Sequence, residues 1–134
     1  MKGEAADIFR RTTDLLSQGR TSDALAMLTK AIVEHPAHAG LACRFADCLH
    51  AMERFQEARD AYGRALALDP GTFDAWYGLG CAEIACRAYG AAISSLNRAT
   101  ALQPTRIDAK FNLGKALFEL GEIDRALDQF AVAA

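Results

Sequence analysis

The stretch RALALDPGTFDAWYGLG, from Arg64 to Gly80, determines how the rest of the chain is interpreted. It begins with an alanine-rich run, breaks at Pro70 and Gly71, and resumes with aromatic residues. Proline followed by glycine typically ends a helix, and Thr72 is a suitable cap for the helix after it. The stretch therefore predicts a helix boundary, and the rest of the chain must show whether this boundary recurs.

Proline recurs at a fixed interval along the chain. Pro36, Pro70 and Pro104 are each separated by 34 residues, and such regular spacing predicts internal repeats. With the proline at position 32, the repeats cover residues 5–38, 39–72, 73–106 and 107–134, and the last repeat is truncated. Alanine recurs in all four repeats at position 20 (Ala24, Ala58, Ala92, Ala126) and at position 27 (Ala31, Ala65, Ala99, Ala133).

The apolar positions within a repeat follow a helical spacing. They form two separate sets whose members lie three or four residues apart, so each set occupies one face of a helix. Position 8 is small in every repeat, which predicts that the second helix crosses closely there. Position 15, between the helices, is Gly19, Glu53, Arg87 and Gly121, and a left-handed turn there would strain the two residues that are not glycine. We expect eight helices in four antiparallel pairs and no strand.

Composition limits the function classes. The 134 residues are 51% hydrophobic and 24% charged, which is typical of a globular domain. A net charge of −2 with interspersed signs gives no basic footprint for nucleic acid. The chain has no apolar run of about 18 residues and no apolar leader, so we expect a cytoplasmic protein that does not bind membranes. Phosphate-loop and nucleophile motifs are missing from the sequence, so we expect no enzyme activity.

These residues resemble the tetratricopeptide repeat, a 34-residue helix–turn–helix unit with the pattern W-x2-L-G, then A-x3-F, A and P. WYGLG (76–80), with Tyr89, Ala92, Leu96 and Pro104, is close to the full pattern. The last repeat lacks the tryptophan but keeps Leu113, Gly114, Ala126 and Phe130, and the first repeat departs most. The resemblance implies an all-α fold, a right-handed α-solenoid of four antiparallel helix pairs, and a single domain spanning residues 1–134.

The resemblance also implies that the first helix of each pair lines a concave groove. On these helices, position 5 is Phe9, Cys43, Tyr77 and Phe111, a set aromatic enough to suit an apolar or amphipathic peptide. Packing against the next repeat is an equal alternative for position 5, and it is favoured for position 12 (Leu16, His50, Ile84, Phe118). The candidate peptide-binding residues are Phe9, Cys43, Arg44, Asp47, Tyr77, Cys81, Phe111, Asn112 and Lys115.

Some family members grip a C-terminal carboxylate with lysine and asparagine at fixed positions of these first helices. In this chain the equivalent positions carry Phe9, Thr13 and Arg44, so we do not expect it to bind chaperone tails.

Two further features have alternative interpretations. Cys43, Asp47 and His50 share one helical stripe, and with Cys81 they could supply four zinc ligands. The chain has no CxxC or HxxxH spacing, however, so we expect reduced cysteines and no metal or other cofactor. Glu83 occupies a normally apolar slot, and we expect it to reach solvent or pair with Arg87 rather than to be a buried carboxylate.

The sequence stops at position 28 of the fourth repeat, which would leave Leu127, Phe130, Ala131 and Val132 near an open end. Either the chain is part of a longer protein, which is the favoured explanation, or self-association covers this end. The two explanations are compatible, and we expect a homodimer or a packed contact through the last helix. The leading hypothesis is a non-catalytic module that binds a protein or peptide in its groove. The alternative is the N-terminal recognition domain of a larger bacterial transferase whose catalytic domain follows Ala134. Repeat folds define a surface rather than a ligand, so no particular partner is indicated.

Overall fold

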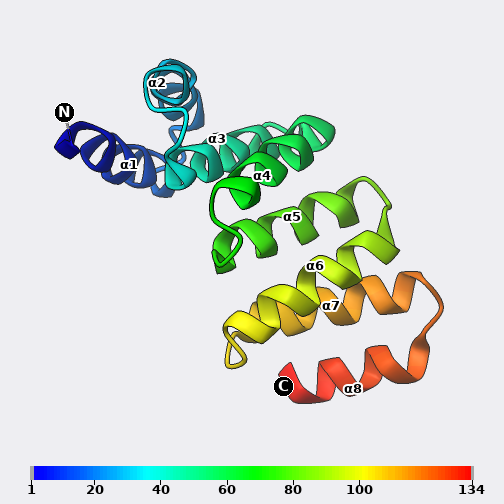
Figure 1. Ribbon diagram of the computed structural model, residues 1–134. Coiled ribbons are helices and arrows are strands. Elements are labelled where there is room, and N and C mark those ends of the chain that lie inside the picture. Colours follow the sequence, from blue (N-terminus) through cyan, green and yellow to red (C-terminus); the bar gives the residue numbers. More distant parts are fainter. Residues whose placement is uncertain (1, 134) are drawn as a thin grey trace. The chain divides into compact units, whose positions relative to one another are not determined.

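The computed structural model describes residues 2–133, which form eight α-helices and no strand (Figure 1). The helices are α1 (Lys2–Ser17), α2 (Thr21–Glu34), α3 (Ala39–Ala51), α4 (Phe55–Leu68), α5 (Phe73–Ala85), α6 (Tyr89–Leu102), α7 (Ile107–Glu119) and α8 (Ile123–Ala133). Helices α3, α5 and α7 begin at the first residues of the second, third and fourth predicted repeats. Met1 and Ala134, the ends of the predicted domain, lie outside the described residues.

A tight left-handed turn joins the two helices of each pair. The residue at position 15 has a positive φ in all four pairs: 75° at Gly19, 61° at Glu53, 62° at Arg87 and 89° at Gly121. Glu53 and Arg87 adopt this conformation although a Cβ makes it unfavourable by about 1 kcal/mol. The expected strain at these two positions is therefore confirmed.

The start of α5 corrects one local expectation. Helix α4 ends at Leu68, two residues before Pro70, and Thr72 is the N-cap residue of α5, as the opening stretch predicts. The Thr72 side chain nevertheless makes no capping hydrogen bond. Helix α3, by contrast, is capped by His38, whose Nδ1 accepts a hydrogen bond from the Leu41 N–H at 3.1 Å.

The chain divides into two compact units, Met1–Pro70 and Gly71–Ala134. The first unit contains α1 to α4, and its core includes Ala24, Leu28 and Leu41. The second unit contains α5 to α8, with a core around Leu96, Leu113 and Leu117 and a smaller cluster at Phe73. Small and bulky buried residues alternate in both units, as antiparallel helix pairs require.

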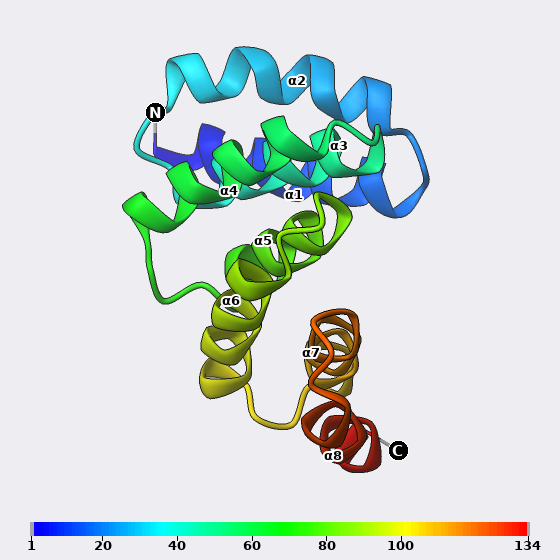
Figure 2. The same cartoon turned by 90° about the vertical axis from the view of Figure 1, so that its right-hand side faces the viewer.

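The close crossings predicted at position 8 are present in the second unit. A Cβ added to Gly80 would lie 2.6 Å from the Leu96 side chain, so α5 and α6 meet at a point where only glycine fits. Gly114 is in the same situation, because an added Cβ would lie 2.6 Å from the Phe130 ring. Figure 2 shows α7 and α8 side by side in this unit. Phe130 is therefore half-buried over Gly114, whereas the sequence had placed it at an open end.

Glu83 corrects a second expectation. It does not reach solvent: only 6% of the residue is exposed, and its Oε1 accepts a hydrogen bond of 2.6 Å from Ser95 Oγ. The favoured prediction of a solvated carboxylate is wrong, and the alternative of a buried one is confirmed. The physical reason is that Ser95 on α6 supplies a buried donor, and sequence spacing alone does not place that donor opposite Glu83.

Within residues 2–133, no helix is both long enough and apolar enough to cross a membrane.

Candidate functional site

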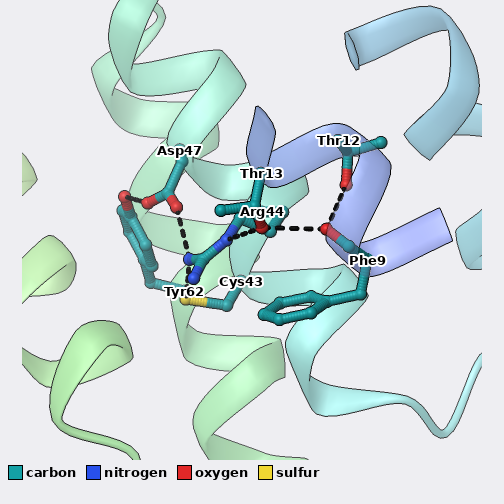
Figure 3. Close-up of polar contacts among 7 residues, drawn as sticks. All are labelled: Phe9, Thr12, Thr13, Cys43, Arg44, Asp47 and Tyr62. Atoms are coloured by element: carbon teal, nitrogen blue, oxygen red, sulfur yellow. Dashed lines mark hydrogen bonds and ion pairs between the residues drawn. The ribbon is translucent and has the colours of Figure 1, made fainter. Parts of the chain in front are cut away.

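In the first unit, Arg44 on α3 is the centre of a polar cluster (Figure 3). Its Nε donates to Thr13 Oγ1 on α1 at 3.0 Å, and its Nη1 donates to Asp47 Oδ2 at 2.8 Å. Its guanidinium also lies over the Phe9 ring, 4.8 Å from the ring centre. Arg44 therefore ties α1 to α3 through both charge and an aromatic face.

Asp47 extends this cluster to a third helix. Its Oδ1 accepts a hydrogen bond from the Tyr62 hydroxyl on α4 (Figure 3). The side chains of Arg44 and Asp47 are 15% and 31% exposed, so the ion pair is largely shielded from water. Cys43 is 2% exposed, with its Sγ 3.9 Å from Arg44 Nη1. The structure thus brings together four of the predicted site residues, Phe9, Cys43, Arg44 and Asp47, mostly as an internal network.

In the second unit, Asn112 on α7 joins two residues of α5. Its Nδ2 donates to the Tyr77 hydroxyl oxygen at 2.8 Å and to Cys81 Sγ at 3.6 Å. The Tyr77 ring also stacks on Phe73, with ring centres 5.6 Å apart and an interplanar angle of 11°. Burial is the main reason that the pKa of the Tyr77 hydroxyl is raised, so this group stays protonated and can donate a hydrogen bond.

Arg106 and Asp108 lie beside Phe73, the residue on which Tyr77 stacks. The Arg106 guanidinium lies over the Phe73 ring, 4.4 Å from its centre, and pairs with Asp108 at 2.8 Å. The hydrogen bond from Arg106 is the main cause that lowers the pKa of the Asp108 carboxyl, so Asp108 stays ionised over a wider acidic range.

Phe111 and Lys115 lie on the exposed side of α7 rather than in the hydrogen-bonded cluster. Phe111 is 51% exposed, although its ring contacts Phe130 at a centre distance of 5.5 Å. Phe118, which the sequence assigns to packing, is 54% exposed, and that prediction is wrong for this repeat. Because α7 is the last first helix among residues 2–133, no further helix pair packs over Phe118. Helical spacing had placed Phe111, Lys115 and Phe118 on one stripe, but this spacing alone does not show which members of the stripe are exposed.

The cysteine and histidine candidates do not come together as the zinc hypothesis requires. Cys43, Asp47 and His50 are not among the described groups whose potential ligand atoms all lie within 4.8 Å of one another. The four cysteines, Cys43, Cys48, Cys81 and Cys86, are not joined by disulfide bonds. Burial, together with the charge of Asp47, raises the pKa of Cys48 to about 11, which makes this thiol unreactive.

Stacked helix pairs with these crossings define the class of helical repeat proteins. The sequence matches two family models, each described as a tetratricopeptide repeat, over residues 15–84 and 87–134. The chain therefore belongs to the tetratricopeptide repeat family, and the expected all-α fold class is confirmed.

Solved structures support the fold. The chain is similar to a crystal structure of MamA, with a TM-score of 0.87 and 25% identity over 97% of this chain and 76% of that one. It is similar to the first tetratricopeptide repeat domain of human RPAP3, with a TM-score of 0.82 and 22% identity over 90% of this chain and 94% of that one. It is also similar to the first tetratricopeptide repeat domain of Spaghetti (RPAP3), which is solved bound to the HSP90 peptide SRMEEVD. The TM-score is 0.84, and the identity is 21% over 90% of this chain and 96% of that one. A comparison with curated proteins gave no match.

Proposed function

We propose that this chain is a non-catalytic protein-interaction module that binds a peptide or partner surface with the first helices of its repeats. The observation that carries the proposal is the exposed stripe of α7, formed by Phe111, Lys115 and Phe118. Two phenylalanines that are about half exposed, two helical turns apart on one face, form an unusually apolar surface for a solvated helix. Such a face suits the apolar side chains of a partner segment.

The chemistry of the stripe indicates what this segment carries. Lys115 lies between the two phenylalanines, so an acidic group between two apolar side chains of the ligand would complement it. Phe111 also lines a depression of about 570 Å³ that is large enough for a bulky side chain. Its other lining residues are Ile107, Phe130, Ala133 and the carboxylate residue Asp108, which is paired with Arg106. We therefore propose an amphipathic, acidic segment as the ligand of α7.

Tyr77, Cys81 and Asn112 are proposed to contact the ligand beside this stripe. Asn112 is only half-buried, and its amide oxygen keeps acceptor capacity beyond the bonds that Nδ2 donates to Tyr77 and Cys81. In the first unit, Phe9, Cys43, Arg44 and Asp47 are proposed contacts as well. We expect them to contribute less, because binding would have to compete with the hydrogen bonds that Arg44 and Asp47 already make.

The peptide-bound neighbour illustrates the proposed mode without defining the ligand. That RPAP3 domain is solved with an HSP90 peptide, which supports peptide binding as a use of this fold. The specific peptide is not carried over, because Phe9, Thr13 and Arg44 stand where a carboxylate clamp would need lysine and asparagine.

Peptides selected from a random display library test the proposal, and the dissociation constant of the best one is then measured by fluorescence anisotropy. Phe118→Ala and Phe111→Ala should each weaken binding about tenfold, since each removes an exposed apolar anchor. Val33→Ala on α2 is the matched control, because Val33 is 77% exposed and lies on a second helix. Circular dichroism verifies that each variant is folded. If folded Phe118→Ala and Phe111→Ala bind as tightly as Val33→Ala, the assignment to α7 is wrong.

A further inference from the structure

Three residues with metal-ligating side chains lie close together in the first unit. Glu4 lies in the first turn of α1, Glu34 is the last residue of α2, and His35 is the C-cap residue that follows it. One potential ligand atom from each of these residues lies within 4.8 Å of the other two. Figure 2 shows the start of α1, marked N, near the end of α2.

The His35 imidazole provides an independent observation. Its Nε2 has essentially no contact with solvent and finds no hydrogen-bond partner among the described residues. Leaving a buried polar atom without a partner costs about 1–3 kcal/mol, so a partner for this nitrogen would stabilise the fold. Neutral imidazole nitrogen is also a common metal ligand, and a bound cation would supply the missing partner.

Local electrostatics favour a cation at the same place. The C-terminal end of a helix carries partial negative charge, and α2 has no basic residue in its last turn to offset Glu34. Lys30 approaches Glu34 only at 3.8 Å, and its side chain is 80% exposed, so this pair offsets little of the charge. Glu4 adds a second carboxylate, and together the two carboxylates would offer a divalent ion charge neutralisation.

The donor set selects the kind of ion. Two carboxylates and one imidazole suit a borderline transition metal such as Zn²⁺, whereas Ca²⁺ and Mg²⁺ prefer oxygen alone. Ligand atoms around a tetrahedral zinc ion lie about 3.4 Å apart, so the side chains need to close in by only about 1 Å or a little more. Glu4 and Glu34 are exposed and can make this movement. Three protein ligands would leave the fourth position to water.

We propose that Glu4, Glu34 and His35 form a site for a zinc-class divalent cation that links the start of α1 to the end of α2. Binding would stabilise the first helix pair, since an ion that binds only the folded chain shifts the unfolding equilibrium. The site is independent of the peptide-binding proposal, because it shares no residue with it.

The test uses Co²⁺ as a spectroscopic probe on the metal-free, reduced full chain. We expect one equivalent to bind with visible absorption but without the near-ultraviolet sulfur-to-metal band that cysteine ligands would produce. His35→Gln and Glu34→Gln should each weaken Co²⁺ and Zn²⁺ binding about tenfold or more. His50→Gln and Glu57→Gln are the matched controls and should leave affinity unchanged. Glu34 is exposed, so Glu34→Gln should leave the fold intact. The test therefore still applies if His35→Gln disturbs the fold.

The result that supports the site is Co²⁺ binding that is weakened at least about tenfold in Glu34→Gln and unchanged in Glu57→Gln. Three results would each overturn it: no binding up to about 1 mM Co²⁺, equal affinity in all variants, or a sulfur-to-metal band that assigns the ion to the cysteines.

Discussion

At the scale of single residues, the protonation of His50 makes the free energy of unfolding depend on pH. Its ring packs edge-on against Phe55 with ring centres 5.0 Å apart, and its Nδ1 is shielded and has no hydrogen-bond partner among the described residues. Burial lowers the pKa of His50 below its ordinary value of 6.5, although the charge of Asp47 acts in the opposite direction. The folded protein therefore favours the neutral ring.

The sign of the pH effect follows from this shift. Between the two pKa values the unfolded chain binds more protons at His50 than the folded chain does, so stability rises with pH there. The His50 contribution is complete above about pH 6.5 and decreases as the pH falls toward the lowered pKa of the folded state. Urea unfolding at several pH values should show that His50→Gln loses less stability than the wild type between about pH 7.5 and 5. Equal losses in both proteins would contradict this role.

Gly80 is required by a close helix crossing. Its missing Cβ leaves room for Leu96, so Gly80→Ala should lower the free energy of unfolding by about 1–3 kcal/mol. Gly90 is the control in the same unit: it lies in α6 with nothing within 4 Å of an added Cβ. Gly90→Ala should raise stability by about 0.5–1 kcal/mol through helix propensity. Denaturant unfolding measures the free energy of unfolding of both variants. If Gly80→Ala and Gly90→Ala change it equally, the crossing at Gly80 is not tight.

Arg44 acts at the level of elements, because it connects α1 with α3. Arg44→Ala should lower the free energy of unfolding by about 2–3 kcal/mol, since it removes two charged hydrogen bonds in a largely shielded place. Arg44→Lys should recover only part of this loss, because lysine lacks the planar fork that reaches both Thr13 and Asp47. The control is Arg20→Ala, which breaks an ion pair whose side chains are 58% exposed and should change stability by less than about 0.5 kcal/mol. Similar losses for Arg44→Ala and Arg20→Ala would show that Arg44 does not join the helices.

The helices themselves could be predicted because their signals are local. The 34-residue spacing of Pro36, Pro70 and Pro104 gives the boundaries, and the small residue at position 8 gives the crossing. Glu83 and Phe118 could not be predicted in the same way. Their environments depend on what another helix places opposite them: Ser95 gives Glu83 a buried partner, and no described helix pair covers Phe118.

The candidate site was predictable only in part. Helical periodicity placed Phe111 and Lys115 on one exposed face of α7, as the structure has them. The same periodicity could not show that Arg44 and Asp47 are already bonded to Thr13 and Tyr62. Hydrogen bonds between helices depend on side-chain reach and on the register between elements, which a single sequence does not encode locally.

At the scale of the whole molecule, self-association through α8 remains a prediction, and exposed apolar side chains on this helix support it. Leu127 and Val132 on α8 are each 59% exposed, and such apolar side chains favour contact with another surface. We expect sedimentation velocity to show a dimer at high concentration. Leu127→Glu should shift the chain toward the monomer, whereas the control Val33→Glu on α2 should not. A monomer at all concentrations would contradict association through α8.

The assignment of residues 1–134 to a single domain, and the alternative of a recognition domain within a larger transferase, also stay predictions. Membership of the tetratricopeptide repeat family supports the more general statement that the chain is a protein-interaction module. The proposed ligand contacts all lie on the first helices, α1, α3, α5 and α7, and this is the central claim at the level of the molecule.

Photo-cross-linking tests that claim most directly. A peptide selected for binding, carrying a benzophenone side chain, is irradiated with the full chain, and the attachment points are mapped by mass spectrometry. We predict cross-links concentrated on α7 around Phe111 and Phe118, with any others on the remaining first helices or on the residues of α8 that line the depression beside Phe111. Cross-links concentrated on α2, α4 or α6, and competed by the free peptide, would show that the chain binds its ligand through the opposite helices and would contradict the account.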